Sequence, residues 1–239
     1  MKQKIVLITG AAKGIGKAIA KEFLRNDFFV LINDKDIKTV KKTEIELKKI
    51  SNNFCFIRAD ISNSTEVNNM IRIIQRNYKK VDVLVNNVGI NIRSSFEDVT
   101  LEEWNEVFNT NLTSPFFLTQ KLIPLINKNG NIIFTSSILG IKADSVSIQY
   151  GVSKAAVIML AKYLAKILAP DIRVNCIVPG FVNTDWHKTK TEKRIKSINF
   201  KIPLKRFATP DEIAKVCLFL IRNKYIIGTP IVVDGGYLL

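Results

Sequence analysis

The clearest pattern in the chain is a series of short apolar runs separated by longer amphipathic segments. The runs are rich in β-branched and aromatic residues, as buried strands are, and the segments between them have helical spacing. Seven runs stand out, at residues 5–8, 28–32, 54–57, 81–85, 131–134, 172–178 and 230–233. Strands that alternate with helices predict βαβ units and a parallel sheet, and right-handed crossovers favour a doubly wound, three-layer α/β sandwich.

Two of the expected helices have starts that are marked by capping chemistry. Thr100 and Glu103 have the spacing of a capping box. Thr209, Pro210 and Glu212 combine a cap, a proline at the first helical position and a reciprocal glutamate. Each motif predicts that a helix begins just after its threonine.

Nothing in the sequence divides the chain into separate parts. It has 239 residues and no linker, repeat or low-complexity segment, so one domain spanning residues 1–239 is expected. Residues 185–202 fit the alternation poorly, because they are charged and lack a strong apolar stripe. An insertion after a strand is a candidate substrate lid, although an exposed helix would have the same pattern.

The composition indicates a cytoplasmic protein. Apolar residues make up 47% of the chain, but no uncharged run approaches the ~18 residues that span a membrane. The first residues hold two lysines before a short apolar run, as a signal peptide does, yet glycines and another lysine follow at once. A first strand and a loop are the better interpretation. The three cysteines, Cys55, Cys176 and Cys217, lie far apart in apolar elements, which favours buried, reduced thiols.

The formal net charge of +15 has two interpretations. It could attract an acidic partner, such as nucleic acid, a membrane or an acidic carrier protein. It could also reflect a proteome that favours Lys, Ile and Asn. The lysines are scattered along the chain instead of forming one block, so the compositional interpretation is favoured and no nucleic-acid or membrane partner is expected.

A glycine-rich turn follows the first strand directly and opens the first helix. Gly10, Gly14 and Gly16 would let the backbone turn tightly and approach a pyrophosphate at the helix N-terminus. The spacing is G-x-x-x-G-x-G, unlike the common G-x-G-x-x-G. The position of the turn between strand and helix makes it a strong indication of a dinucleotide.

The end of the second strand bears on which dinucleotide is bound. Asp34 lies eighteen residues after Gly16, where an acid can accept hydrogen bonds from the adenosine ribose. Its charge would repel a 2′-phosphate, whereas Lys13 or Lys35 could neutralise one. NAD(H) is therefore favoured over NADP(H), and the alternative is that Asp34 is an ordinary turn residue.

Polar residues also follow the third and fourth strands, at the sheet edge where open α/β sheets bind ligands. Asp60 is expected to bond the adenine amino group, and Asn86 and Gly89 to flank the nucleotide. Taken alone, these residues are turn chemistry. Their register with the glycine loop is what indicates binding.

The candidate catalytic residues lie at the end of the fifth strand and on the helix after it. Tyr150 comes thirteen residues after Ser137, and Lys154 is one turn further along the same helix face. We expect the ammonium to lower the pKa of Tyr150, so that the phenol can exchange a proton with a carbonyl or alcohol while Ser137 holds the same oxygen. Lysines are common here, but of five tyrosines only Tyr150 has one at i+4.

Other catalytic classes have little support. His187 is the one histidine, so no metal-ligand cluster is expected. A serine hydrolase needs a histidine base with an orienting acid, and His187 lies in the candidate lid without one.

These motifs together resemble those of the short-chain dehydrogenase/reductase family over essentially the whole chain. They are T-G-x-x-x-G-x-G at 9–16, Asp60, N-N-x-G at 86–89, Asn111 in N-T-N-L-T, Ser137, Tyr150 with Lys154, and P-G-F-V-N-T at 179–184. The resemblance implies a Rossmann-like sheet ordered 3-2-1-4-5-6-7 and a homotetramer. It also implies a catalytic tetrad of Asn111, Ser137, Tyr150 and Lys154, in which the asparagine holds a water that relays protons through the lysine. One departure is Val88, where an alanine is usual.

The same resemblance extends the candidate cofactor site. Val182 and Thr184 are expected to hold the nicotinamide half. The cofactor residues so implied are Gly10, Ala12, Lys13, Gly14, Ile15, Gly16, Asp34, Asp60, Ile61, Asn87, Val88, Gly89, Tyr150, Lys154, Pro179, Gly180, Val182 and Thr184.

Within the family, the chain looks like bacterial 3-oxoacyl-(acyl-carrier-protein) reductases. An acyl-thioester substrate, with acyl carrier protein as a possible partner, is then expected. Lys128 falls where those enzymes have a basic carrier contact, but Pro170 and Asp171 replace a second basic residue. Residues 89–96 are reminiscent of polyol and sugar-acid dehydrogenases, so a small secondary alcohol is the alternative substrate. A catalytically silent nucleotide-binding regulator is the remaining alternative.

Overall fold

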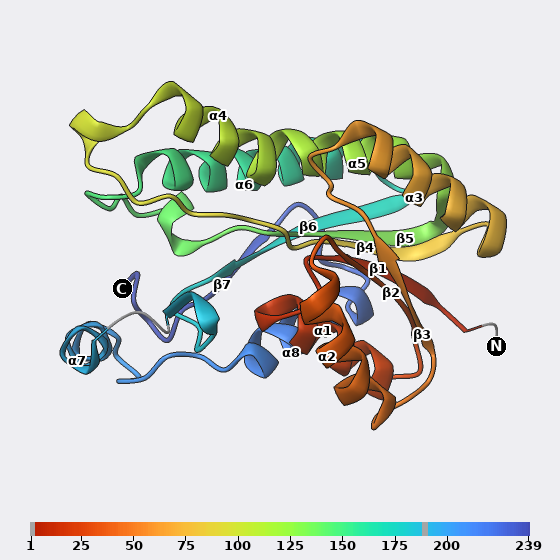
Figure 1. Cartoon of the computed structure of the whole chain (residues 1–239), viewed down its shortest axis with the longest axis horizontal. Coiled ribbons are helices and arrows are strands. Elements are labelled where there is room, and N and C mark those ends of the chain that lie inside the picture. The colour runs from red at the N-terminus through yellow and green to blue at the C-terminus, as the bar shows by residue number, and fades with distance from the viewer. Residues whose placement is uncertain (1–2, 188–190) are drawn as a thin grey trace.

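The seven apolar runs form the strands of one parallel sheet in the computed structural model, which describes residues 3–187 and 191–239 (Figure 1). The strand order is β3-β2-β1-β4-β5-β6-β7, as predicted. The strands are β1 (Ile5–Thr9), β2 (Phe29–Asp34), β3 (Phe54–Arg58), β4 (Val81–Asn86), β5 (Ile126–Thr135), β6 (Ile172–Pro179) and β7 (Pro230–Val233). β5 begins five residues earlier than its apolar run, at Ile126.

Helices cover both faces of the sheet (Figure 1). The longer helices are α1 (Gly14–Arg25), α2 (Ile37–Lys48), α3 (Ser64–Asn77), α4 (Leu101–Phe108), α5 (Ser114–Leu122), α6 (Ile148–Leu168), α7 (Glu192–Lys201) and α8 (Pro210–Arg222). The short helical turns are η1 (Phe96–Asp98), η2 (Asn109–Thr113), η3 (Ile123–Leu125), η4 (Ile138–Gly140) and η5 (Asp185–His187). Helices α3 to α6 form one layer and α1, α2 and α8 the other, whereas α7 stands apart from both layers.

The sheet is apolar on both faces because alternate side chains of each strand enter different cores. Leu7 of β1 belongs to the core beneath α3, α5 and α6, whereas Val6 and Ile8 belong to the core shared with α1 and α8. All three side chains are fully buried. Strands covered on both faces read as continuous apolar runs, which is why the runs were visible in the sequence.

The two capping motifs have different outcomes. Thr209 and Glu212 form the complete reciprocal box at the start of α8, as predicted. Thr100 accepts the backbone N–H of Glu103 at the start of α4, but the Glu103 carboxylate accepts a hydrogen bond from Ser94 instead of returning to Thr100. Helix α4 therefore begins where it was expected, but only the threonine half of the capping box forms.

In the part of the chain that the structure describes, no helix is long and apolar enough to cross a membrane. Cys176 and Cys217 are buried, Cys55 is partly buried, and all three are free thiols.

Candidate active site

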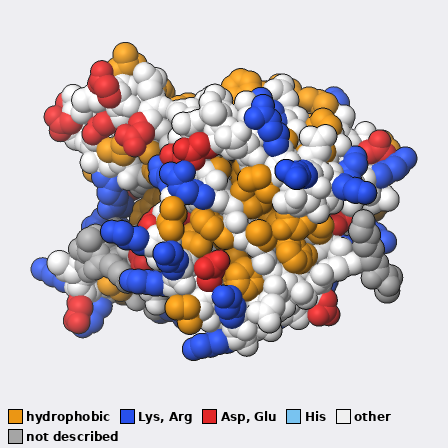
Figure 2. Space-filling model, turned by 45° about the vertical axis from the view of Figure 1, so that its right-hand side comes forward, with side chains coloured by type: hydrophobic (Ala, Val, Ile, Leu, Met, Phe, Trp, Pro, Cys, Tyr) orange, Lys and Arg blue, Asp and Glu red, His pale blue; other side chains and the backbone are white. Residues whose placement is uncertain are grey.

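A cavity of about 920 Å³ opens at the carboxyl ends of the strands. The segments that follow β1, β2, β3, β4, β5 and β6 all contribute to its wall, together with α6, η5 and α7. It spans the junction between β1 and β4, where the strand order reverses and where open α/β sheets bind ligands. Figure 2 shows a hollow between the part of the molecule that carries α4 and the part that carries α7, with Lys and Arg side chains gathered along it.

The glycine loop has the geometry that a pyrophosphate site needs. Gly10 and Gly14 have φ angles of 60° and 56°, which residues other than glycine rarely adopt. A methyl group on Gly16 would lie 2.2 Å from the carbonyl oxygen of Gly10, so only glycine allows this close turn. Gly16 itself is buried and does not line the cavity.

The N-terminus of α1 fits an anion. Lys13, its N-cap, makes no side-chain capping hydrogen bond, and no acidic residue lies in the first turn. By contrast, side chains cap α2, α3, α4, α7 and α8. Lys13, Gly14 and Ile15 line the cavity, so the free N–H groups and the positive end of the helix dipole face it. The residues present therefore fit a dinucleotide pyrophosphate.

Asp34 is held rigidly at the end of β2. Its carboxylate accepts the backbone N–H of Ala12 and that of Asp36, each at 3.1 Å. Ala12 is buried and does not line the cavity, so its contribution is to fix Asp34. The bond from the N–H of Asp36 is that of an Asx turn, so Asp34 does shape the turn after β2, and it also lies on the cavity wall.

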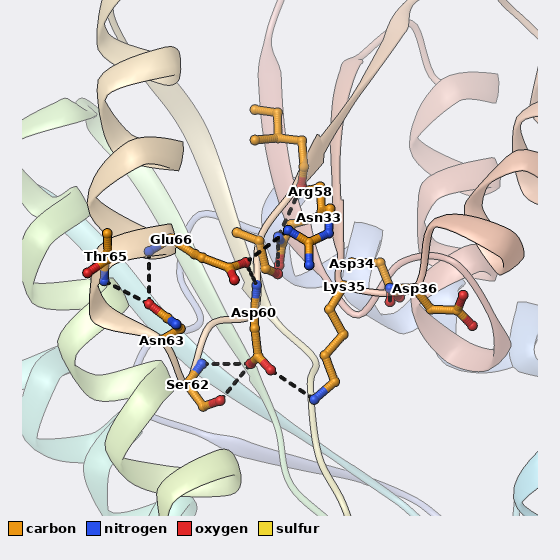
Figure 3. A network of polar contacts seen from close by, with 12 residues as sticks. Asn33, Asp34, Lys35, Asp36, Arg58, Asp60, Ser62, Asn63, Thr65 and Glu66 are labelled. Atoms are coloured by element: carbon orange, nitrogen blue, oxygen red, sulfur yellow. Dashed lines mark hydrogen bonds and ion pairs between the residues drawn. The ribbon is translucent and has the colours of Figure 1, made fainter.

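Asp60 is engaged in a polar network next to Asp34 (Figure 3). Its carboxylate accepts hydrogen bonds from the N–H and hydroxyl of Ser62 and pairs with Lys35 at 2.9 Å. Burial would raise the pKa of Asp60, but the bonds from Ser62 and Lys35 outweigh burial and hold that pKa below its usual range. The hydrogen bond between Lys35 and Asp60 also raises the pKa of Lys35. Glu66 completes the network by accepting the backbone N–H of Asp60.

The end of β4 is fastened to the glycine loop. Thr9 accepts the backbone N–H of Asn87, and the Asn87 amide donates to the carbonyl oxygens of Thr9 and Gly10. Asn87, Val88 and Gly89 line the cavity. The expectation for Asn86 was wrong: its side chain is buried on the other face of the strand and donates to Thr119 of α5.

Ser137, Tyr150 and Lys154 are brought together on the cavity wall. Ser137 follows β5, and the other two lie one turn apart near the start of α6. The lysine ammonium is 5.7 Å from the centre of the Tyr150 ring. Ser136 ties the strand end to this helix, because its hydroxyl donates to the carbonyl oxygen of Lys154.

The expected effect of Lys154 on the pKa of Tyr150 was wrong for this structure. Burial raises the pKa of Tyr150 to about 12, and the hydrogen bond with Ser137 acts in the opposite direction without overcoming burial. The ammonium of Lys154 is turned toward the carbonyl oxygen of Thr135, at 2.9 Å. Burial lowers the pKa of Lys154 to about 8. Tyr150 is therefore a protonated acid at neutral pH.

Asn111 lies in the π-helical turn η2 and is buried, so its side chain does not line the cavity. Its amide donates to the carbonyl oxygen of Ile90 and to the Ser153 hydroxyl, and its oxygen accepts the N–H of Ile90. A methyl group on Gly89 would lie 3.0 Å from the Lys154 ammonium and 3.4 Å from the Asn111 oxygen. Asn111 thus braces the segment after β4 against α6, and π-helical turns are frequent at functional sites.

The segment after β6 closes the cavity on the opposite side. Pro179, Gly180, Val182 and Thr184 line it. The backbone of Val182 pairs with that of Ala208, which fixes the segment. Thr184 faces the glycine loop, since a methyl group on Gly14 would come within 3.5 Å of it.

Comparison with known proteins finds similar reductases along nearly the whole chain. Residues 10–238 match the family model described as enoyl-(acyl carrier protein) reductase. The chain is 35% identical to the 3-oxoacyl-(acyl-carrier-protein) reductase FabG of Buchnera aphidicola, over 98% of this chain and 97% of that one. It is 34% identical to FabG of Thermotoga maritima, over 99% and 98% of the two chains.

Solved structures agree in fold. A glucose/ribitol dehydrogenase-type short-chain dehydrogenase/reductase from Brucella melitensis superposes with a TM-score of 0.93, at 26% identity over 99% of this chain and 97% of that one. RhlG of Pseudomonas aeruginosa, in an NADP complex, also superposes with a TM-score of 0.93. It is 29% identical to this chain, over 99% of this chain and 96% of that one.

The chain belongs to the short-chain dehydrogenase/reductase family. It is therefore an oxidoreductase that acts on CH–OH groups with NAD(P), and the predicted resemblance to 3-oxoacyl-(acyl-carrier-protein) reductases is confirmed. Within residues 3–187 and 191–239, no three His, Cys, Asp or Glu side chains cluster so as to hold a metal ion.

Most of the predicted dehydrogenase site is assembled, since every predicted catalytic or cofactor residue except Ala12, Gly16, Asn86 and Asn111 lines the cavity. The predicted lid contributes in part: η5 and α7 flank the cavity, while residues 188–190 lie outside the described residues. Ile198 anchors α7 with its buried side chain.

Several residues of the cavity wall were not found from the sequence. On α7, Arg194, Ser197 and Lys201 share one helix face with Ile198, and Arg93 lies on the segment after β4. The i, i+3, i+4, i+7 spacing of the α7 residues was present in the sequence, but three of the four are polar, so the apolar periodicity used to find elements did not reveal it.

Proposed function

We propose that this enzyme reduces the carbonyl group of a 3-oxoacyl thioester to a secondary alcohol, with Tyr150 as the general acid. The observation that carries the proposal is the grouping of Ser137, Tyr150 and Lys154 on a wall of the same cavity that reaches the glycine loop. The similarity to the FabG proteins supports the substrate class.

In this mechanism the protein's residues move the proton. A reduced nicotinamide, when bound, supplies hydride to the carbonyl carbon. The Tyr150 hydroxyl donates its proton to the carbonyl oxygen, and the Ser137 hydroxyl donates a hydrogen bond to the same oxygen. In the proposed mechanism the Lys154 ammonium, which donates to the Thr135 carbonyl oxygen in this structure, turns toward the phenolate that remains, and a proton from solvent then restores Tyr150. The high pKa of Tyr150 supports reduction as the working direction, because the phenol is fully protonated at neutral pH.

Asn111 is proposed to act through its neighbours. Its side-chain bonds to Ile90 and Ser153 support a positioning role for the wall that faces Lys154. A water that relays protons to Lys154 remains part of the proposal, held by the backbone of η2 instead of by the occupied side-chain amide.

NAD(H) is the proposed cofactor. The carboxylate of Asp34, fixed by two backbone N–H groups, is suited to accept bonds from ribose hydroxyls and repels a 2′-phosphate. Lys35 is the neighbouring cation that could offset this repulsion, but its ammonium is paired with Asp60. The NADP complex of RhlG belongs to a chain that is 29% identical, so it does not decide the preference here.

The far side of the cavity supports a substrate that is apolar near the carbonyl and anionic further out. Leu139 and Ile198 give apolar wall, while Arg93, Arg194 and Lys201 add exposed cations with no ionic partner among residues 3–187 and 191–239. A thioester linked through phosphopantetheine has both features.

Acyl carrier protein remains a proposed donor of that thioester. The predicted carrier contact at Lys128 gains no support, because its ammonium pairs with the carboxylate of Asp171 at 3.3 Å. The pair is electrically neutral, so this site offers little attraction to an acidic carrier.

A second candidate function is oxidation or reduction of a polyol or sugar acid. Two structural similarities favour this candidate. One is to the Brucella glucose/ribitol dehydrogenase-type protein. The other is to L-sorbose reductase from Gluconobacter frateurii, which is 27% identical over 99% of this chain and 97% of that one and superposes with a TM-score of 0.92. The unpaired cations would then hold a carboxylate. A catalytically silent regulator has less support, because the complete set of Asn111, Ser137, Tyr150 and Lys154 is retained.

A homotetramer is part of the proposal. An apolar stripe on α6 supports a helix-to-helix interface, since Val152, Met159, Tyr163 and Ile167 share one face and are 44%, 51%, 64% and 68% exposed. The cytoplasmic location stays a prediction.

The test of the proposed function is an activity screen that crosses NADH and NADPH with 3-oxoacyl thioesters, polyols and sugar acids. Reduction of the thioester with NADH is the expected result. Turnover of polyols alone would replace the substrate proposal with the second candidate, and thioester reduction that requires NADPH would overturn the cofactor proposal.

A further inference from the structure

Trp186 lies on the cavity wall directly beside the proposed acid. It belongs to η5, and its ring centre is 6.1 Å from that of Tyr150, with the two ring planes tilted by 57°. This separation is typical of a direct aromatic contact. The side chain is 49% exposed, so much of the indole is not used in packing the fold and is open to a ligand.

The position of Trp186 limits how a carbonyl can reach Tyr150. The Lys154 ammonium lies 5.7 Å from the centre of the Tyr150 ring, and the indole of Trp186 also borders that ring. A carbonyl whose oxygen bonds the Tyr150 hydroxyl lies beside that ring, so the indole is within reach of one of its two carbon substituents. Leu139 and Ile198 line the same cavity, so its wall offers further apolar side chains.

We propose that Trp186 is a specificity-determining residue, whose indole forms the apolar wall against which the alkyl chain of the substrate carbonyl packs. The inference rests on the proposed function, because it takes a carbon chain attached to the reacting carbonyl as the ligand. Trp186 has no titratable group and takes no part in proton transfer. Its removal should therefore change KM, and do so more for longer chains, while kcat stays nearly constant.

The kinetic test compares two neutral substrates, 3-oxobutanoyl- and 3-oxodecanoyl-N-acetylcysteamine. Each methylene that loses apolar contact weakens binding about fourfold, so Trp186→Ala should raise KM for the longer substrate about fifteenfold if two methylenes are affected. KM for the shorter substrate should change by less than about threefold, and Trp186→Phe should restore most of the loss by the same transfer argument. Equal KM values for wild type and Trp186→Ala with both substrates would overturn the inference.

Fluorescence gives an independent readout. The chain has two tryptophans, so Trp104→Phe leaves Trp186 as the only one. Trp104 stacks on Phe108 of α4 and does not line the cavity, so its replacement is a matched control that should leave turnover unchanged. In the Trp104→Phe/Tyr150→Phe variant, where substrate is held without turnover, 3-oxodecanoyl-N-acetylcysteamine should change the emission in a saturable way. Unchanged emission at concentrations that saturate the wild-type enzyme would contradict the inference.

Failure of the inference can be told apart from failure of the proposed function. If wild type reduces no thioester, the proposed function and the alkyl-chain wall are both wrong. If wild type reduces thioesters but the Trp186 variants keep its KM values, the proposed function stands and the inference alone is wrong.

Discussion

Replacement of Asp34 by asparagine should weaken the preference for NADH over NADPH. The amide oxygen of asparagine can still accept the N–H of Ala12, which one carboxylate oxygen now accepts at 3.1 Å, but the amide NH2 cannot accept the N–H of Asp36. The change therefore removes one negative charge at the proposed ribose site together with one hydrogen bond of the turn after β2. An unchanged Tm would show that the loss of this bond leaves the fold intact.

The magnitude follows from the interactions that differ between the two cofactors. Two unit charges about 4 Å apart interact with about 1 kcal/mol in water and about 4 kcal/mol near a protein surface. Removing the repulsion between Asp34 and a 2′-phosphate should thus favour NADPH by about 1–3 kcal/mol, which is about 5- to 150-fold in the ratio of kcat/KM values.

The assay measures kcat/KM for NADH and NADPH with one saturating carbonyl substrate, at low and at physiological salt. Asp60→Asn is the companion variant, because it leaves Asp34 in place and frees Lys35 from its ion pair. It should also move the ratio toward NADPH. A wild-type preference for NADPH, or an Asp34→Asn ratio equal to that of wild type, would refute the reasoning.

Three further predictions concern other parts of the site. Gly16→Ala should abolish dinucleotide binding and lower Tm, because the new methyl group would meet the Gly10 carbonyl oxygen at 2.2 Å; calorimetry that shows unchanged binding and Tm would contradict this. Burial lowers the pKa of Lys154 to about 8, so its positive charge is present below that pH and lost above it. We therefore expect kcat/KM for reduction to fall as the pH rises, with a midpoint near pH 8. A pH profile that stays flat up to about pH 10 would contradict this role of Lys154. Replacement of both Arg194 and Lys201 by alanine should raise KM for a coenzyme A thioester about tenfold at low salt and leave KM for the neutral N-acetylcysteamine thioester unchanged; equal effects on both substrates would argue against an anion site.

The sheet was predictable because its inner strands are buried on both faces, and burial on both faces makes their sequences mostly apolar. The strand order depended on the family resemblance. The start of β5 was missed because residues 126–130 hold Asn127, Lys128 and Asn129, which break the apolar pattern although the backbone continues the strand.

Local sequence motifs predicted which residues line the cavity next to α1. The glycine turn, Asp34 and the N-N-x-G segment are contiguous stretches whose backbone geometry is set by their own residues. Asn86 and Asn87 were harder to assign, because adjacent residues at a strand end point to opposite faces and the sequence does not say which faces the ligand.

Interactions between distant parts of the chain could not be read from the sequence. The spacing of Tyr150 and Lys154 predicted a shared helix face, but it gave neither the burial that raises the pKa of the phenol nor the Thr135 carbonyl that draws the ammonium away. The ion pair between Lys35 and Asp60 likewise joins residues 25 positions apart. Such pairs exist only once the strands are side by side.

The central claim is that Tyr150 supplies the proton, and kinetic analysis of Tyr150→Phe tests it most directly. The Phe ring keeps the contact with Trp186 and removes only the hydroxyl, so the dinucleotide Kd should stay within about threefold of wild type while kcat falls by about 10²–10⁴-fold. Tyr225→Phe is the matched control, since that tyrosine is 99% exposed and does not line the cavity; it should leave both quantities unchanged. A Tyr150→Phe enzyme that retains a kcat within tenfold of wild type would contradict the account.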